Sequence, residues 1–163
     1  KKIISPKNNR KFYSWVDLGS EYRAPELSSA LLYSQLLKIK KIQNNRKRIW
    51  NIFSELIDKL KTKKCYLIKP HKKSESAYHI LALIFKSTEL ANSFKKKIQS
   101  QGIAATFHYV PLHKSSMGKK FCNYKLPLTE EIYSRVVRLP LYSEMTKQEI
   151  KKVYYSIKNF LIK

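Results

Sequence analysis

The run from His108 to His113 holds the densest group of chemically active side chains in the sequence. Two imidazoles and a phenol, from His108, Tyr109 and His113, fall within six residues. Imidazole exchanges protons near neutral pH, and all three groups can form hydrogen bonds to a sugar or a phosphate. Pro111 ends the strand that the preceding residues predict, and loops after strands often carry function. A structural role fits the same residues, with His108 at a sheet edge and Tyr109 in the core.

The segment Tyr13–Arg23 is a second candidate, because it places aromatic residues, a glycine and an arginine directly before a predicted helix. A helix N-terminus beside Arg23 suits an anion such as phosphate. A hydrophobic arm that packs on the core or on a partner fits this segment equally well. His79 lies in an apolar run, where a histidine is more often buried and hydrogen-bonded than catalytic.

Several common kinds of site find no support in the residue counts. The chain has 4 His and 2 Cys, without a C-x-x-C or H-x-x-x-H spacing, so we expect no metal site. Three glycines are too few for a P-loop or a dinucleotide-binding fingerprint. Glu130 and Glu131 are adjacent acids, but they fall in the first turn of a predicted helix, where acids are favoured in any case.

Hydrophobic spacing, caps and turn residues predict alternating helices and short strands. The Thr146-x-x-Glu149 spacing is a capping box, which opens the last amphipathic helix. Helices are expected over 25–60 (one bent helix or two in succession), over 87–102, from about 129, and from 146 onward. Strands are expected at 66–68, 78–85, 103–110 and 135–139.

This order predicts an α+β (α/β) fold, in which a three- to four-stranded sheet is covered by helices. Residues 1–24 are expected to form an N-terminal arm and interface loop. Residues 25–163 are expected to form a small α+β domain, and a chain of 163 residues is long enough to bury a core.

The strong positive charge has two interpretations. The chain carries 28 Lys and 6 Arg against 11 acidic residues, which gives a formal net charge of +23. A basic chain can bind RNA or another polyanion. Arginine, which contacts phosphates and base edges through two hydrogen bonds, is scarce, and abundant Lys, Ile and Asn are typical of an AT-rich genome. We therefore expect a solvated basic surface without a nucleic-acid partner, and a free-standing polyanion-binding module is the alternative.

The composition also favours a cytoplasmic protein. The longest apolar run, at 80–85, is too short to cross a bilayer, so no membrane partner is expected. Two cysteines, Cys65 and Cys122, cannot build a disulfide scaffold, which favours a reducing compartment. Since the sequence does not begin with Met, we expect it to be a piece of a longer polypeptide.

An ordered series of motifs resembles one known family. The series is Y-S-W-V-D-L-G-S-E-Y at 13–22, E-L at 26–27, Q-L at 35–36, F-H-Y-V-P-L-H at 107–113 and R-L-P-L at 138–141. In this order the motifs are similar to the C-terminal part of the DegT/StrS-type sugar aminotransferases, which use pyridoxal phosphate (PLP). The resemblance runs from about Tyr13 to the end of the chain.

The resemblance implies the small C-terminal domain of a fold-type I aminotransferase, packed beside a larger PLP-binding domain. Such enzymes work as dimers and transfer an amino group from glutamate to a nucleotide-linked sugar, here a dTDP-4-keto-6-deoxy sugar for cell-surface polysaccharide. The family pattern assigns the sugar-nucleotide site to His108, Tyr109 and His113, with His79 matching a histidine of the preceding strand. It assigns contact with the neighbouring subunit's cofactor phosphate to the loop of Ser20, Glu21, Tyr22 and Arg23.

Two departures from the family pattern limit what the resemblance implies. Many relatives have Asn in place of Glu21, whose carboxylate would repel a phosphate. The lysine that forms a Schiff base with PLP lies in the large domain, in a Gly-rich context that none of the 28 lysines here shares. The resemblance therefore implies that this chain supplies substrate-site walls and dimer contacts and is inactive by itself. A relative with other PLP chemistry, such as a dehydratase, is a further hypothesis.

Overall fold

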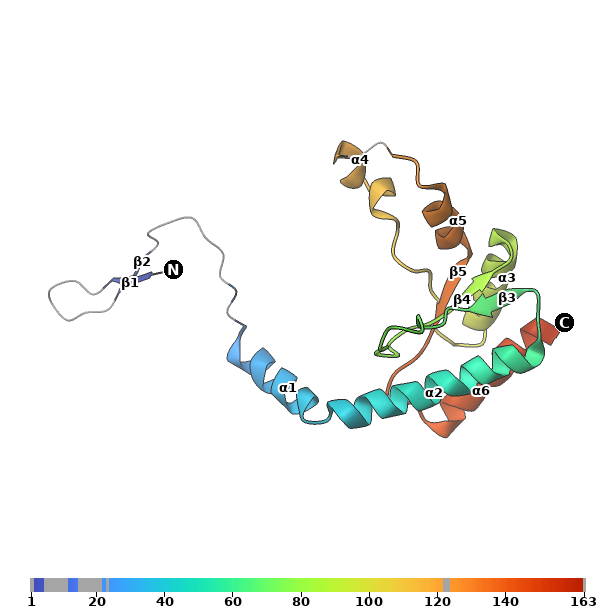
Figure 1. Ribbon diagram of the computed structural model, residues 1–163, viewed down its shortest axis with the longest axis horizontal. Helices are drawn as coiled ribbons and strands as arrows, with labels where there is room; N and C mark the ends of the chain where they lie inside the picture. The colour runs from blue at the N-terminus through green and yellow to red at the C-terminus, as the bar shows by residue number, and fades with distance from the viewer. Residues whose placement is uncertain (1, 5–11, 15–21, 23, 122–123, 163) are drawn as a thin grey trace. The chain divides into compact units, whose positions relative to one another are not determined.

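The computed structural model describes residues 2–4, 12–14, 22, 24–121 and 124–162 (Figure 1). Contacts along the chain separate two compact units, Lys1–Ile39 and Lys40–Lys163. The arm expected over residues 1–24 falls inside the first unit, which also includes the helix that follows it. Within the described ranges, no helix is both long and apolar enough to cross a membrane.

The first unit contains a two-stranded sheet and one helix. Strand β1 (Lys2–Ile4) pairs antiparallel with β2 (Phe12–Ser14), with Ile3 opposite Tyr13. Helix α1 (Glu26–Leu36) begins directly after Pro25, which is its N-cap residue, and Glu26 suits the first turn, as predicted. No residue of α1 is buried, although several of them are leucines.

The second unit contains the main sheet and the helices that pack on it. Helix α2 follows α1 after a turn at residues 37–38, so the predicted helical stretch over 25–60 is two helices in succession. In chain order the elements are α2 (Ile39–Leu60), β3 (Cys65–Leu67), β4 (Leu81–Phe85), α3 (Thr88–Gln99), the 3-10 turn η1 (Leu112–Lys114), α4 (Gly118–Phe121), α5 (Pro127–Arg135), β5 (Val136–Leu139) and α6 (Lys147–Ile162).

Strands β3, β4 and β5 form an antiparallel sheet with β4 in the centre. The register places Leu83 of β4 opposite both Leu67 of β3 and Val137 of β5. Residues opposite one another in a sheet project to the same face, so these three side chains form an apolar row across it. An antiparallel sheet covered by helices confirms the predicted α+β class.

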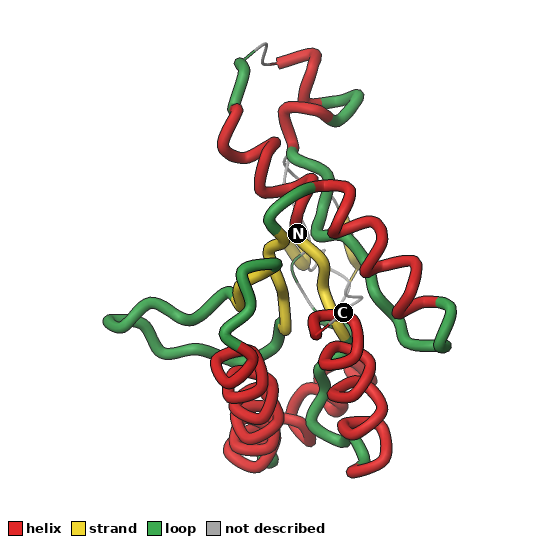
Figure 2. Tube along the Cα trace, turned by 90° about the vertical axis from the view of Figure 1, so that its right-hand side faces the viewer, coloured by secondary structure: helices red, strands yellow, loops and turns green. Residues whose placement is uncertain are grey.

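The main core lies on the face that this apolar row occupies. Leu81, Leu83 and Phe85 alternate along β4 and are fully buried, together with residues of α2, α3 and α6. In Figures 1 and 2, α2 and α6 both lie below the sheet. Phe94 of α3 is at the centre of this packing, since its ring centroid lies 4.7 Å from that of Phe85 and 5.1 Å from that of Phe160.

The second face of the sheet is covered less completely. Ala82 and Ile84, the other two residues of β4, are buried with Val136 of β5 in a separate apolar cluster. Ile132 of α5 and Ile80 pack against this cluster. As a result β4 is buried on both faces, as its continuous apolar sequence predicts, but only part of its second face is closed by a helix.

Side-chain caps begin two of the helices, and the second of them is the predicted capping box. The Ser87 hydroxyl accepts a hydrogen bond from the Leu90 backbone N–H at the start of α3. Thr146 and Glu149 form a reciprocal capping box before α6: the Glu149 N–H donates to the Thr146 hydroxyl, and the Thr146 N–H donates to the Glu149 carboxylate. These bonds satisfy backbone donors that have no partner within the helices.

Two predicted strands are shorter than expected. The strand expected at 78–85 begins only at Leu81, because Tyr78 has a φ of +46°, outside the β region. The strand expected at 103–110 is reduced to one antiparallel bridge between Thr106 and Arg138. Ile103 and Ala105 are buried as alternation predicts, but Phe107 and Tyr109, on the same predicted face, are exposed.

The packing of Phe94 predicts a large difference between two substitutions of the same type. Phe94→Ala should lower the free energy of unfolding by about 3 to 5 kcal/mol, because it leaves a cavity at a site that is 0% exposed. Phe121→Ala, at a site that is 79% exposed, should change it by less than about 0.5 kcal/mol. Urea unfolding of both variants measures this, and equal losses would contradict the packing described here.

Candidate functional site

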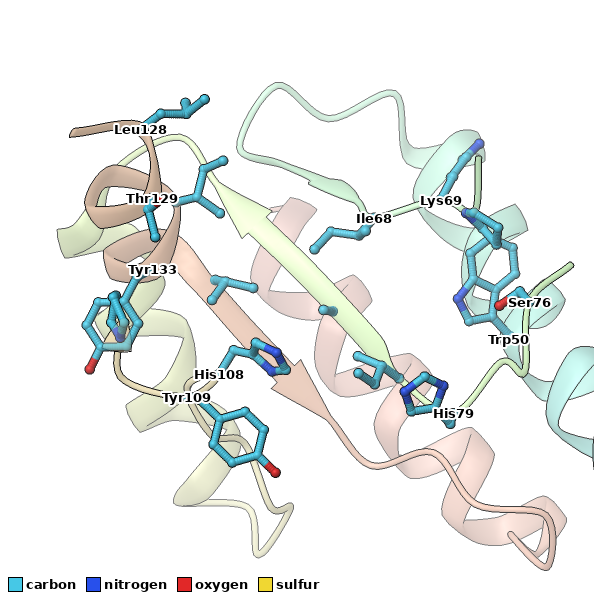
Figure 3. A pocket seen from close by; sticks show the side chains of 16 residues that line it. Trp50, Ile68, Lys69, Ser76, His79, His108, Tyr109, Leu128, Thr129 and Tyr133 are labelled. Atoms are coloured by element: carbon cyan, nitrogen blue, oxygen red, sulfur yellow. The ribbon is translucent and has the colours of Figure 1, made fainter. Parts of the chain in front are cut away.

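A pocket of about 550 Å³, called the histidine pocket below, opens on the incompletely covered face of the sheet. Ala82 and Val136 line its base, and residues of α5 form one end (Figure 3). His79, His108 and Tyr109 also line it, so three of the predicted site residues converge from two separate segments of the chain. An apolar base with polar rings around it is typical of sites that hold a small organic ligand in one orientation.

His108 reaches the pocket because the chain before it is fixed at the edge of β5. The backbones of Thr106 and Arg138 exchange two hydrogen bonds, of 3.0 and 2.7 Å. One residue earlier, the carbonyl oxygen of Ala105 accepts a 2.7 Å hydrogen bond from the Gln99 side chain. This bridge holds the segment beside the sheet, so His108, two residues later, lies over the pocket. Its ring centroid is 5.1 Å from that of Tyr109.

His79 reaches the pocket from the irregular stretch before β4. The positive φ of Tyr78 turns the chain, and the alternation of β4 does not extend back to His79. The expectation that His79 is buried in an apolar strand is wrong, because its side chain is exposed and it lies outside β4. The Tyr78 ring packs edge-on against Trp50 at a centroid distance of 5.5 Å, which supports this turn from α2.

His113 lies outside the residues that line the pocket. Its side chain is only 8% exposed, and Nε2 is 3.1 Å from Oε1 of Glu130 on α5. Lys114 forms an ion pair with the same carboxylate. The hydrogen bonds from Lys114 and from His113 hold the pKa of the Glu130 carboxyl below its ordinary value. The contacts of His113 therefore fasten the loop after Pro111 to α5, and Pro111 itself lines the pocket.

The predicted phosphate-contact loop belongs to the first unit. Ser20, Glu21 and Arg23 lie outside the described residues, so their assignment stays a prediction. Tyr22 is described and is 93% exposed. Its side chain is thus available to a partner.

Several lining residues were not identified from sequence. Trp50 follows Ile49 in α2 and belongs to the main core, and it also lines the pocket. Lys69 follows β3, and both carboxylate oxygens of Asp58 on α2 bind its ammonium group at 2.8 and 2.9 Å. The ring of Tyr133 on α5 packs edge-on against that of Phe107, with 6.1 Å between the ring centroids. Only the amphipathic pattern of α2 and α5 could have indicated Trp50 and Tyr133.

The histidine pocket does not supply a complete PLP site. Covalent attachment of PLP requires a free lysine amine, and the only lysine in the lining, Lys69, is paired with Asp58. A carboxylate usually pairs with the pyridine nitrogen, and the lining contains neither Asp nor Glu. The described side chains also bring together no group of three or more His, Cys, Asp or Glu that could hold a metal. The pocket fits a substrate wall better than a cofactor cradle.

The sequence profile of the DegT/DnrJ/EryC1/StrS aminotransferase family matches residues 3–158. The chain belongs to this family. The family resemblance of the ordered motifs is thereby confirmed, and PLP is the cofactor that this family implies. The membership covers nearly all of the chain, including both segments that supply the histidine pocket.

Two curated relatives match nearly the whole of this chain, but the match covers less than half of each relative. An uncharacterised protein of Methanocaldococcus jannaschii is 26% identical over 156 residues, which cover 92% of this chain and 40% of that protein. The dTDP-3-amino-3,6-dideoxy-α-D-galactopyranose transaminase of Aneurinibacillus thermoaerophilus is 23% identical over 159 residues, which cover 97% of this chain and 42% of that enzyme. The chain therefore spans about two fifths of the length of these curated relatives.

Solved structures show the same fold. PseC of Helicobacter pylori, an aminotransferase involved in the biosynthesis of pseudoaminic acid, aligns with a TM-score of 0.81 at 17% identity. The alignment covers 98% of this chain and 43% of PseC. This similarity confirms the predicted aminotransferase fold.

The Glu130 ion pairs predict that one substitution loosens the loop beside the pocket. In Glu130→Gln, hydrogen exchange at the amides of residues 114–119 should become faster, because His113 and Lys114 lose their shared carboxylate. Glu131→Gln is the matched control, since among the described residues the ion pair of Glu131 is with Arg135, within α5. Its amides over 114–119 should exchange as in the parent chain.

The lowered pKa of Glu130 also gives this effect a pH dependence. A folded-state pKa below the ordinary value of 4.5 means that Glu130 contributes stability above pH 4.5 and loses this contribution as the pH falls through the lowered pKa. Loop protection in the parent chain should therefore hold at pH 5 to 7 and fall below about pH 4. Protection that stays constant down to the pH of global unfolding would contradict the role of this carboxylate.

Proposed function

We propose that this chain is the C-terminal part of a PLP-dependent nucleotide-sugar aminotransferase and forms one wall of its substrate site. The observation that carries the proposal is the convergence of His79, His108 and Tyr109 on one pocket, within a chain that belongs to an aminotransferase family. The relatives named above that have an assigned activity or pathway act in amino-sugar biosynthesis. Their role is consistent with a hexose as the group that the pocket accepts.

The chemistry of the pocket suits a deoxy sugar. The methyl group and ring carbons of a 6-deoxyhexose can pack on Ala82, Ile132 and Val136, which carry no polar side-chain atoms. The imidazoles of His79 and His108 and the phenol of Tyr109 can hydrogen-bond the sugar hydroxyls or a keto oxygen. These side chains orient the sugar and shield it from water, and PLP supplies the electron sink for amino transfer when it is bound.

The proposal assigns the cofactor amine to another part of the enzyme. It is supported by the pairing of Lys69 with Asp58 and by the lining, which offers no carboxylate for the pyridine nitrogen. This chain by itself is then inactive and contributes binding surface alone. Glutamate is the proposed amino donor and a dTDP-4-keto-6-deoxy sugar the acceptor, since the segment at 13–20 resembles transaminases that make dTDP-4-amino-4,6-dideoxygalactose.

The exposed apolar residues of α1 support a role in assembly. Leu27, Leu31 and Leu32 are all exposed on this helix, and apolar groups in such a row are normally covered by protein. We assign them to contact with the larger PLP-binding portion of the enzyme, in a cytoplasmic homodimer. The exposed Tyr22, just before this helix, fits the same interface.

Substitutions in the pocket should weaken binding of a nucleotide sugar. His108→Ala and Tyr109→Ala should each raise the dissociation constant for dTDP-glucose by about tenfold, the effect of losing one hydrogen bond with partial loss of stacking. Tyr155→Ala is the control, because Tyr155 is also exposed but lies on α6, away from the pocket. Equilibrium dialysis measures all three variants. Equal affinities in the parent chain and both pocket variants would contradict the proposed function.

A further inference from the structure

A second cavity, called the lysine cleft below, lies beside the histidine pocket. Its volume is about 780 Å³, and it opens between α2 and the loop before β4. Lys47 of α2 lines one side, and Lys72 and Lys73 line the loop side. Glu75 is the only acidic residue in the lining, and within the described part of the chain none of these four side chains forms an ion pair. Three lysines against one glutamate give the lining of the cleft an excess of positive charge.

The two cavities meet at Ser76, which lines both of them. Figure 3 shows Ser76 beside Trp50 at one end of the histidine pocket, opposite the end formed by α5. Trp50 lines the histidine pocket, and Tyr78, packed against it, lines the lysine cleft. Ser76 and the Trp50–Tyr78 contact therefore mark the boundary at which the two cavities adjoin.

The loop between the cavities is held in a definite conformation. Tyr78 has a φ of +46°, which is unfavourable for a bulky residue and is often found at functional sites. Its backbone N–H donates a 3.0 Å hydrogen bond to the Ser76 hydroxyl, and Lys47 Nζ lies 5.9 Å from the centre of its ring. The side-chain oxygen of Gln43, also in the lining, is buried without a hydrogen-bond partner. These contacts hold the loop against α2, with Lys47 beside Tyr78.

The histidine pocket lacks the charge that a nucleotide sugar requires. The diphosphate of such a ligand carries two negative charges, which need cationic or N–H partners. The only lysine of the histidine pocket, Lys69, already forms an ion pair with Asp58, at 2.8 Å. The adjoining lysine cleft offers Lys47, Lys72 and Lys73, none of which forms an ion pair with another described side chain.

We propose that the lysine cleft binds the diphosphate of the nucleotide sugar whose hexose occupies the histidine pocket. This inference rests on the proposed function and adds a subsite to it. Lysine suits the role, because a flexible ammonium group can follow a diphosphate without the fixed geometry of a guanidinium. A sugar diphosphate is an elongated ligand, so its two parts would occupy the two adjoining cavities on either side of Ser76.

The test compares two double variants that remove the same charge. Lys72→Gln with Lys73→Gln alters the cleft, and Lys119→Gln with Lys120→Gln alters an adjacent exposed pair on α4. Dissociation constants for dTDP-glucose and for inorganic pyrophosphate are measured by NMR titration at several salt concentrations. The cleft variant should weaken both ligands about tenfold or more and reduce the salt dependence, whereas the α4 variant should change them less than about twofold. Thermal unfolding confirms that both variants remain folded.

The His108→Ala variant, titrated in the same way, distinguishes failure of the proposed sugar site from failure of the diphosphate subsite. If His108→Ala weakens dTDP-glucose and the cleft variant does not, the sugar site stands and the diphosphate subsite is overturned. If neither affects it, or if the parent chain does not bind dTDP-glucose, the proposed function falls together with the subsite. Equal losses in the cleft and α4 variants would show bulk electrostatics and overturn the subsite. The subsite would also be overturned if single-stranded RNA bound at least as tightly as dTDP-glucose and lost affinity in the Lys72→Gln, Lys73→Gln variant.

Discussion

Burial of β4 on both of its faces is the constraint on which the site depends. Leu81, Leu83 and Phe85 anchor the strand in a core built with three helices, and this core fixes the sheet. Ala82 and Ile84 then project to the opposite face, where α5 covers only one end. Because Ala82 is small, the uncovered part of that face is hollow. The core thus determines where the pocket lies, and the residues around it determine what the pocket can bind.

The side chains that give the pocket its chemistry come from irregular segments fastened to this rigid sheet. The Thr106–Arg138 bridge brings in His108, and the turn at Tyr78 brings in His79. The Glu130 carboxylate, through His113 and Lys114, secures the loop that follows. Such an arrangement is common in binding sites, because irregular backbone can direct side chains at angles that helices and strands do not allow. It also explains how a chain with few glycines and no nucleotide-binding motif forms a concave polar site.

Local patterns were sufficient to predict much of the fold. The capping box at Thr146 and Glu149, the helix start after Pro25 and the doubly buried β4 all depend on neighbouring residues and occur as predicted. What could not be predicted depends on tertiary contacts. The alternation of apolar residues alone predicts a strand over 103–110, but in the structure only Thr106 pairs with β5, through Arg138. Nothing in the sequence around His113 indicates that Glu130, 17 residues away, is its partner. The ion pair of Lys69, the pocket's only lysine, with Asp58 is likewise visible only in three dimensions.

The central claim is that His79 and His108 face the sugar of a bound nucleotide sugar. The chain has 4 His, so imidazole NMR signals can be assigned with single His→Gln variants. On titration with dTDP-glucose, the signals of His79 and His108 should shift together and saturate at one dissociation constant. The signal of His113, which is enclosed by its contact with Glu130, should stay nearly unchanged. Saturable binding that leaves both pocket histidines unaffected, or the absence of binding, would contradict the account.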